Sequence, residues 1–182
     1  MKYKSLEDFK KYKEVEQDTI SLYNNKIPKK ILDIWREYGF GSFMKNYIKI
    51  INPSEYKELL DESYFRGKES IPVMVTGLGD IITWEKNRYL SIVKYRKGTF
   101  DIIEDGFEYF LTDIMDTEYV KDFLDNLQYE EAVIDKGILE YDECFGYVPL
   151  LGLGGSEKVE NLKKVKIKEH IELITQLVGK IE

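Results

Sequence analysis

Apolar residues in the first sixty positions recur at intervals of three and four, which is the spacing of an amphipathic helix. The pattern is clearest after Pro28, a residue that suits the first turn of a helix, and Gly39 closes the run. We predict a helix between these two residues, a shorter one over residues 5–14, and a third that begins at Asn52. Their apolar positions are Leu6 and Phe9; Ile31, Ile34, Trp35 and Tyr38; and Tyr56, Leu59 and Leu60.

The period changes in the middle of the chain, where short runs of β-branched and aromatic residues alternate with turn signals. The turn signals lie at residues 77–80, 86–87 and 97–98. Short strands joined by such tight connections favour an antiparallel meander of three or four strands. The predicted strands cover residues 73–76, 81–84, 89–95 and 99–103.

Helical spacing returns afterwards and predicts helices over residues 107–114, 117–127, 129–136 and 168–178. Helices before and after one block of strands indicate an α+β fold, a central antiparallel β-meander flanked by N-terminal and C-terminal helices. The apolar run over residues 148–151 is too short for a helix. We expect it to add a strand to the meander or to pack on its core.

The composition narrows the class of protein. Of 182 residues, 43 % are hydrophobic, which is enough for a core and excludes wholesale disorder. One Cys and one His exclude a disulfide framework and leave almost no room for a Cys/His zinc site. No apolar run approaches the length of a membrane span, and residues 1–5 lead into a polar segment. We therefore expect a cytoplasmic protein that does not enter a membrane.

Charge is distributed unevenly along the chain. The net charge is -7, which argues against nucleic acid as a partner. Residues 101–143 hold fifteen Asp or Glu and two Lys, about -13, whereas the remainder carries about +6. The acidic segment is either a solvated helical face or a docking surface for a basic partner. The partner-binding candidates are Asp122, Asp125, Glu130 and Glu131.

No set of residues indicates catalysis. The glycine-rich stretch 152–156 lacks the Lys of a phosphate-binding loop, and Glu157 stands where the dinucleotide fingerprint requires glycine, so a tight turn is the simpler interpretation. Nothing in the spacing brings Cys144 and His170 together, and packing explains both residues. Paired acids such as Glu130 and Glu131 are adjacent rather than convergent. We predict no catalytic residue, no cofactor and no metal.

Two stretches resemble known families. The first runs from about residue 28 to residue 98 and resembles the GAD-like domain of bacterial proteins. It is carried by Pro28, Ile31-Leu32, Trp35 and Tyr38-Gly39-Phe40, by Asn52-Pro53 and Tyr56, and by Thr76-Gly77-Leu78-Gly79-Asp80-Ile81 with Trp84. The second resembles the C-terminal domain of type VI secretion immunity proteins, which protect against DNase effectors. It is carried by residues 142–155, 161–165, 169–171 and 176–177, although Leu151-Gly152 stands where the family has an Ala-rich strand.

The resemblance implies a GAD-like domain over residues 1–105 and an immunity-protein domain over residues 106–182, packed together as one unit. It also implies a cytoplasmic protein that neutralises a toxin without catalysis, and we expect that toxin to be a basic nuclease. It gives no contact residues and no oligomeric state. A small-molecule sensor or scaffold, whose strands and Tyr or Trp side chains line a pocket, is the alternative; an enzyme using scattered carboxylates ranks last. The identity of the neighbouring gene would distinguish the toxin-neutralising protein from the small-molecule sensor or scaffold.

Overall fold

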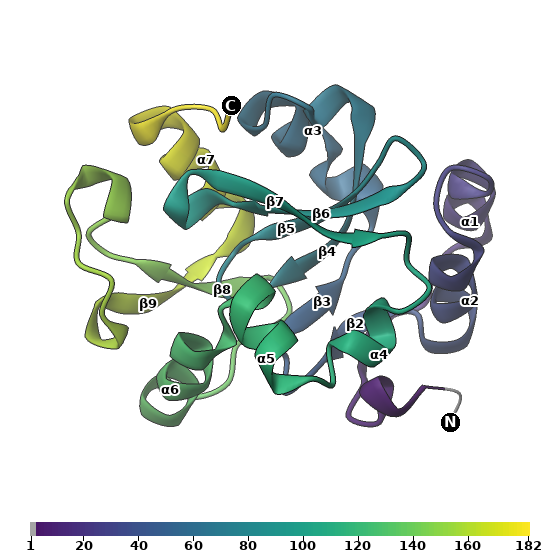
Figure 1. The fold of residues 1–182 in the computed structure, drawn as a ribbon, viewed down its shortest axis with the longest axis horizontal. Coiled ribbons are helices and arrows are strands. Elements are labelled where there is room, and N and C mark those ends of the chain that lie inside the picture. The colour runs from purple at the N-terminus through teal and green to yellow at the C-terminus, as the bar shows by residue number, and fades with distance from the viewer. Residues whose placement is uncertain (1–2) are drawn as a thin grey trace.

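The computed structural model describes residues 3–182, and within that range seven strands form one antiparallel sheet in chain order (Figure 1). The predicted α+β class and the meander over residues 73–103 are confirmed, because the last four strands pair in sequence. The strands are β1 (Lys10–Lys13), β2 (Phe40–Phe43), β3 (Ile48–Ile50), β4 (Ser70–Thr76), β5 (Ile81–Glu85), β6 (Tyr89–Lys94) and β7 (Thr99–Asp105).

The first three strands are not predicted by the sequence pattern, and the helix expected over residues 5–14 is wrong. A short 3-10 turn leads instead into β1, whose four side chains are all exposed. β1 is held by backbone pairing to β2, with Lys10 opposite Ser42. Gly41 permits this approach, because a Cβ there would lie 2.3 Å from the carbonyl oxygen of Lys10. Because β1 is held by a strand that is distant in the sequence, the residues of β1 themselves show no periodicity that would identify a strand.

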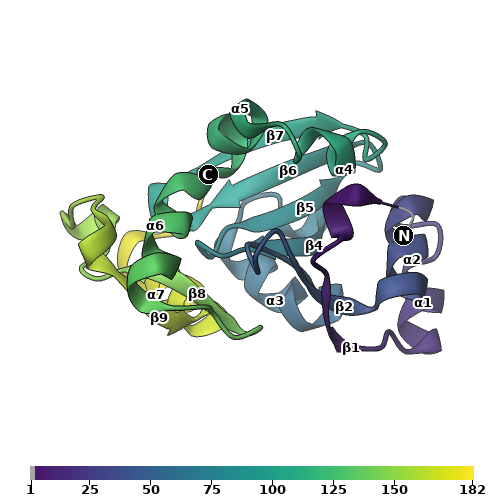
Figure 2. The same ribbon diagram turned by 90° about the horizontal axis from the view of Figure 1, so that it is seen from below.

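Helices cover both faces of the sheet (Figures 1 and 2). The helix after Pro28 is confirmed and ends before Gly39, and Asn52 caps the next helix by accepting the Ser54 amide hydrogen at 3.1 Å. The expected C-terminal helix is confirmed too. The helices are α1 (Gln17–Tyr23), α2 (Lys29–Tyr38), α3 (Pro53–Ser63), α4 (Phe110–Asp113), α5 (Thr117–Tyr119), α6 (Asn126–Lys136) and α7 (Ile167–Val178).

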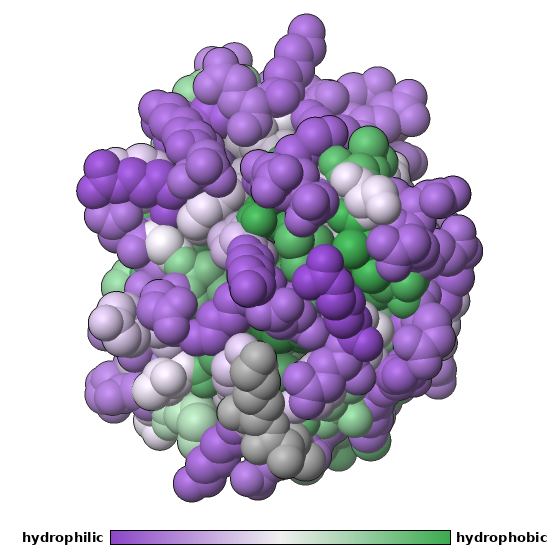
Figure 3. Space-filling model, turned by 90° about the vertical axis from the view of Figure 1, so that its right-hand side faces the viewer, coloured by the Kyte–Doolittle hydropathy of each residue, from purple (hydrophilic) through white to green (hydrophobic). Residues whose placement is uncertain are grey.

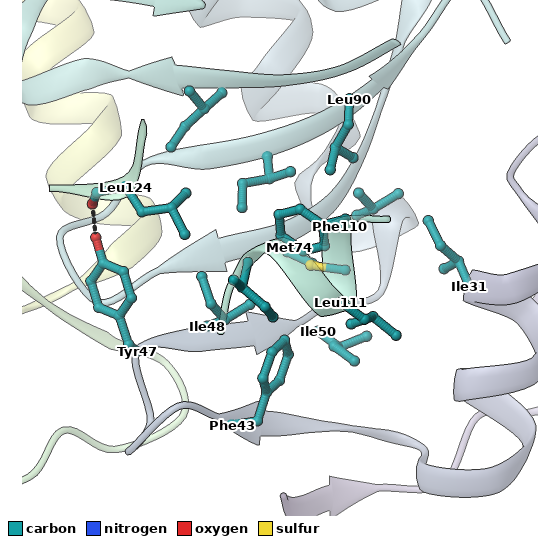
Figure 4. Packing of buried hydrophobic residues seen from close by; sticks show 14 of the residues in the cluster. Ile31, Phe43, Tyr47, Ile48, Ile50, Met74, Leu90, Phe110, Leu111 and Leu124 are labelled. Carbon is teal, nitrogen blue, oxygen red and sulfur yellow. Dashed lines mark hydrogen bonds between the residues drawn. The ribbon is translucent and has the colours of Figure 1, made fainter. Parts of the chain in front are cut away.

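Successive residues of the central strands point into two different cores, and both sets are apolar. One core lies under α2 and α4–α6, where Ile48, Ile50 and Met74 of the sheet lie near Phe110 and Leu111 (Figure 4). The other core lies under α3 and α7. On β4, β5 and β6, Met74, Ile82 and Ile92 pack in the first core, whereas Val75, Ile81 and Val93 pack in the second.

The helix predicted over residues 117–127 is interrupted. A π-helical turn over Val120–Leu124 follows α5, and Asp125 then adopts the left-handed conformation with φ 56°. This reverses the backbone, so α6 begins afresh at Asn126. Leu124 is fully buried, and its carbonyl oxygen accepts a hydrogen bond from the Tyr47 hydroxyl (Figure 4). Tertiary contacts, rather than local periodicity, set the break.

The C-terminal segments form a separate two-stranded hairpin of β8 (Glu143–Tyr147) and β9 (Leu162–Lys166) beside the large sheet (Figure 1). The prediction that residues 148–151 add a strand to the meander is wrong, whereas their packing on the core is confirmed. Val148 is exposed, Leu150 is buried in the core under α7, and a 3-10 turn follows. Gly154 has φ +89°, which confirms the tight glycine turn.

The helices within residues 3–182 are too short or too polar for any of them to cross a bilayer. The face at the right of Figure 1 is largely hydrophilic, with smaller groups of hydrophobic side chains between the charged ones (Figure 3).

Removing everything after Gly137 should leave a fragment that aggregates. The deleted segment carries Ile167, Ile171 and Ile174, which cover the second core, and their loss exposes the fully buried Val75 and Ile81 to water. We expect a hydrophobic dye to bind the 1–137 fragment and its melting transition to be broad, whereas the full chain melts cooperatively. A soluble fragment with a sharp transition would show that the two segments are independent.

Candidate functional site

The turn between β4 and β5, residues 76–80, is where the sheet meets the C-terminal segments. Thr76 holds the turn together, because its Oγ1 accepts hydrogen bonds from two backbone amides of the turn, each with an N···O distance of 3.2 Å. The carbonyl oxygen of Gly77 accepts the amide hydrogen of Phe145 at 2.7 Å. A Cβ on Gly77 would lie 2.4 Å from the Tyr129 ring. The glycine in this motif therefore permits close contact between the two halves of the chain.

A buried ion network begins at the end of this turn. Asp80 is fully buried, and the Arg96 guanidinium, with 3 % of the side chain exposed, lies 2.8 Å from it. The same nitrogen lies 2.8 Å from Asp125, which also pairs with Lys94 at 3.1 Å and Lys97 at 3.2 Å. We call these five residues the Arg96 network. It joins the β4–β5 turn, the end of β6 and the start of α6.

The two carboxylates respond differently to this environment. Burial raises the pKa of Asp80, and the opposing charge of Arg96 offsets only part of that effect. Burial acts on Asp125 as well, but the hydrogen bond and charge of Arg96, together with Lys94, hold its pKa at about 2. Asp125 is therefore ionised at neutral pH and serves as the shared anion of three cations.

The structure separates the four predicted partner-binding residues. Asp122, Glu130 and Glu131 are exposed, on the π-helical turn and on α6. Asp125 has 24 % of its side chain exposed and is engaged by the Arg96 network. Sequence reasoning missed that network. The signal that the sequence offered was Asp80 in a predicted turn and Arg96 directly after the strand that pairs with β5.

Exposed apolar side chains stand between the acids of residues 101–143. Ile134 is the most exposed, at 87 %. α4, α5 and α6 lie on one face of the sheet and pack on the same core (Figure 2), and the exposed side chains belong to these helices and to the segments between them. Apolar anchors within a charged rim are typical of protein–protein interfaces. We call this the acidic surface; its acids are Asp122, Glu130 and Glu131, and its apolar members are Tyr109, Met115, Phe123, Leu127 and Ile134.

The two residues considered for nucleophilic chemistry are both buried. Burial raises the pKa of Cys144 to about 12, so its thiol stays protonated at neutral pH. Burial lowers the pKa of His170, which packs on Gly146: a Cβ there would lie 2.3 Å from its Nε2. Within residues 3–182, no group of three or more His, Cys, Asp or Glu side chains could hold a metal ion.

Two cavities bear on the small-molecule alternative. One, of about 270 Å³, lies between the 3-10 turn Tyr95–Lys97, the segment after β8, and α7. The other, of about 340 Å³, lies between the N-terminal turn and α6, and Tyr47, Tyr129 and Glu130 line it. Tyrosines line both, as the small-molecule alternative expects, but no tryptophan does.

Comparisons with known proteins confirm both resemblances. Residues 3–96 match the family model of the GAD-like domain, and residues 104–178 match that of the T6SS immunity protein Tdi1, C-terminal. The crystal structure of Atu4351 from Agrobacterium tumefaciens is similar, with a TM-score of 0.77 and 18 % identity. The alignment covers 94 % of this chain and 87 % of that one, which shows a shared fold. No relative was found among curated proteins.

Replacing Asp125 by Asn should destabilise the fold by about 1–3 kcal/mol at pH 7, because three cations lose their shared anion. Asn tolerates the left-handed backbone, so the change tests the charge. Asp122→Asn is the control, on an exposed residue three positions away, and should change stability by no more than about 0.5 kcal/mol. Urea unfolding measures both.

The pH dependence gives a second readout. Since the pKa of Asp125 is lowered in the fold, its stabilisation is complete above the ordinary carboxyl pKa of about 4. It is lost as the pH falls towards about 2. The stability difference between the native chain and Asp125→Asn should therefore shrink over that window. A difference that stays constant from pH 7 to pH 2 would contradict the assigned charge.

Proposed function

Because this chain belongs to the GAD-like domain family and its C-terminal part matches a T6SS immunity-protein family, we propose that it neutralises a bacterial toxin by binding it. The toxin class that fits best is a basic nuclease, blocked at its active site or substrate groove. The proposed action is non-catalytic and takes place in the cytoplasm. The observation that carries this proposal is the immunity-family match over residues 104–178, the segment that also holds most of the acidic surface.

The acidic surface supports a basic protein as the partner. Within the described residues, no cation pairs with Asp122, Glu130 or Glu131, so their charges are free to act at a distance. A nuclease carries basic groups that bind phosphates, and acidic groups on an inhibitor can occupy the same positions. Attraction of this kind accelerates encounter, while apolar anchors such as Ile134 slow dissociation.

Reversing the three free charges, Asp122→Lys, Glu130→Lys and Glu131→Lys together, should slow association with the toxin encoded beside this gene about tenfold or more at low salt. The effect should diminish at high salt, where the screening length falls to about 3 Å. Asp125 stays unchanged, because a lysine there would meet three cations. The measurement is surface-immobilised binding kinetics, with circular dichroism as the test of folding.

The control reverses three exposed acids on other elements, Asp18→Lys, Glu37→Lys and Glu172→Lys, and so changes the net charge equally. It should leave the association rate within about twofold. Equal slowing by both triple variants would mean that only net charge matters. Folded variants with unchanged kinetics would show that the acidic surface is merely solvated, and a chain that fails to bind the toxin would refute the proposed function itself.

Purified protein should show no nuclease, phosphatase or glycosidase turnover and no stoichiometric transition metal by elemental analysis. The reason is that the thiol of Cys144 is buried and protonated, and that His170 is packed against glycine. An activity that Cys144→Ala or His170→Gln abolishes in a folded protein would contradict the non-catalytic proposal.

A further inference from the structure

The two edges of the seven-stranded sheet differ in how they are protected against pairing with another strand. β1 and β7 lie at opposite edges (Figure 2). Three of the four exposed side chains of β1 are lysines, and lysine on an edge strand disfavours the addition of a further strand. β7 contains no lysine, arginine or proline, and its charged side chains are all acidic. The edge at β7 therefore repels acidic segments, whereas basic ones can approach it.

Residues 99–102 form the open part of β7, which we call the β7 edge. Among residues 3–182 their backbone groups pair with β6 alone, so the groups that face away from β6 have no partner in the described chain. The open part ends at Ile103. This residue has no opposite residue on β6, as in a β-bulge, and its carbonyl oxygen accepts a hydrogen bond from the Tyr119 hydroxyl at 3.3 Å. The β7 edge can thus pair with one extended segment of a few residues.

The two faces of the β7 edge differ in chemistry. Phe100 and Ile102 lie on the face of the second core, and Ile102 is 49 % exposed. Phe65, at 46 % exposed, extends this apolar side, because its ring centroid lies 5.3 Å from that of Phe100. Asp101 is exposed on the opposite face, the side of α4–α6. No cation pairs with its carboxylate among residues 3–182.

These features define the segment that fits the β7 edge. An added strand places its side chains alternately on the two faces of the sheet. Those beside Phe100 and Ile102 gain contact area if they are apolar. Those beside Asp101 gain if they are basic, because opposite charges on neighbouring strands attract each other and like charges repel. The acidic surface lies on the same side of the sheet as Asp101, so the basic side chains also face its carboxylates.

We propose that the β7 edge binds an extended segment of alternating basic and apolar residues by strand addition. Backbone hydrogen bonds hold the segment, and the alternation fixes which of its faces lies toward α4–α6. This inference rests on the proposed function in one respect: it takes the toxin as the protein that supplies the segment.

A synthetic peptide tests the edge without the toxin. The probe is acetyl-(Lys-Val)3-Lys-amide, titrated into the isotope-labelled full chain and followed by the backbone amide signals. We expect saturable shifts at residues 99–102 with a Kd on the order of 1 mM or tighter, together with slower hydrogen exchange there. The amides of residues 10–13 in β1 should not change, because that edge carries lysines.

Two comparison peptides separate the contributions. The same peptide with its central amides N-methylated keeps the charge but cannot donate to the edge. Acetyl-(Glu-Val)3-Glu-amide keeps the backbone donors but reverses the charge. Each should bind at least tenfold more weakly than the lysine peptide, on the scale of about 1.4 kcal/mol for each tenfold change.

Variants locate the binding. Ile102→Lys gives the β7 edge the protection that β1 has, and should weaken peptide binding about tenfold or more. Ile138→Lys is the matched control, because it changes the same residue type and net charge at another exposed position, and should change binding less than twofold. Asp101→Asn should weaken binding severalfold. Circular dichroism tests the folding of each variant.

The same pair of variants connects the edge with the toxin. Ile102→Lys should accelerate dissociation of the toxin about tenfold, and Ile138→Lys less than twofold. Toxin binding that both folded variants retain equally would overturn strand addition and leave the proposed function intact. A native chain that binds the peptide but not the toxin would refute the proposed function, and with it the toxin as the source of the segment.

Three further results would overturn the proposal. The first is that the N-methylated peptide binds as well as its parent, which would leave only charge attraction. The second is that Ile102→Lys and Ile138→Lys bind the peptide equally, which would place it elsewhere. The third is that the native chain is a dimer that Ile102→Lys converts to a monomer, which would assign the β7 edge to a second copy of the chain. Light scattering after gel filtration measures this last outcome.

Discussion

The fold depends on one buried guanidinium. Arg96 stands at the end of β6 with a fully buried carboxylate, Asp80, on one side and a half-buried one, Asp125, on the other. Removing three charges from water is costly, and only close pairing offsets that cost. The arrangement therefore tolerates little displacement of the β4–β5 turn, of β6 or of the start of α6. It connects the region that matches the GAD-like domain with the region that matches the immunity family.

This constraint also determines how charge is presented to solvent. Asp125 occupies the position of an N-cap for α6, but its side chain makes no capping hydrogen bond because it faces Arg96. Asp122 and Glu130, on either side of Asp125 in the sequence, have no cationic partner among residues 3–182 and remain exposed. The paired carboxylate therefore lies within the molecule, whereas the unpaired ones face solvent. One segment thus serves both stability and the proposed docking, and only the position of each carboxylate distinguishes the two roles.

Close backbone packing supports the same junction. A Cβ on Gly77 would lie 2.4 Å from the Tyr129 ring, and Gly79 has φ +78° with its Cβ position 3.0 Å from the Cys144 Sγ, so both positions favour glycine. Lys49 of β3 is fully buried and donates hydrogen bonds to the carbonyl oxygens of Glu140 and Glu143. Burial lowers the pKa of Lys49 to about 8, and the charges of Glu143 and Asp142 offset part of that effect. Polar contacts of this precision account for the alignment of the hairpin with the sheet.

The sequence by itself determined the parts that local physics controls. The helical spacing between Pro28 and Gly39, and the β-branched and aromatic runs separated by turn signals in β4–β7, could be recognised without a structure. Only the tertiary structure decided the rest. β1 has four exposed side chains and exists because β2 pairs with it, and the break at Asp125 exists because Arg96 holds that carboxylate. Both depend on contacts between residues far apart in the chain, which periodicity and composition do not encode.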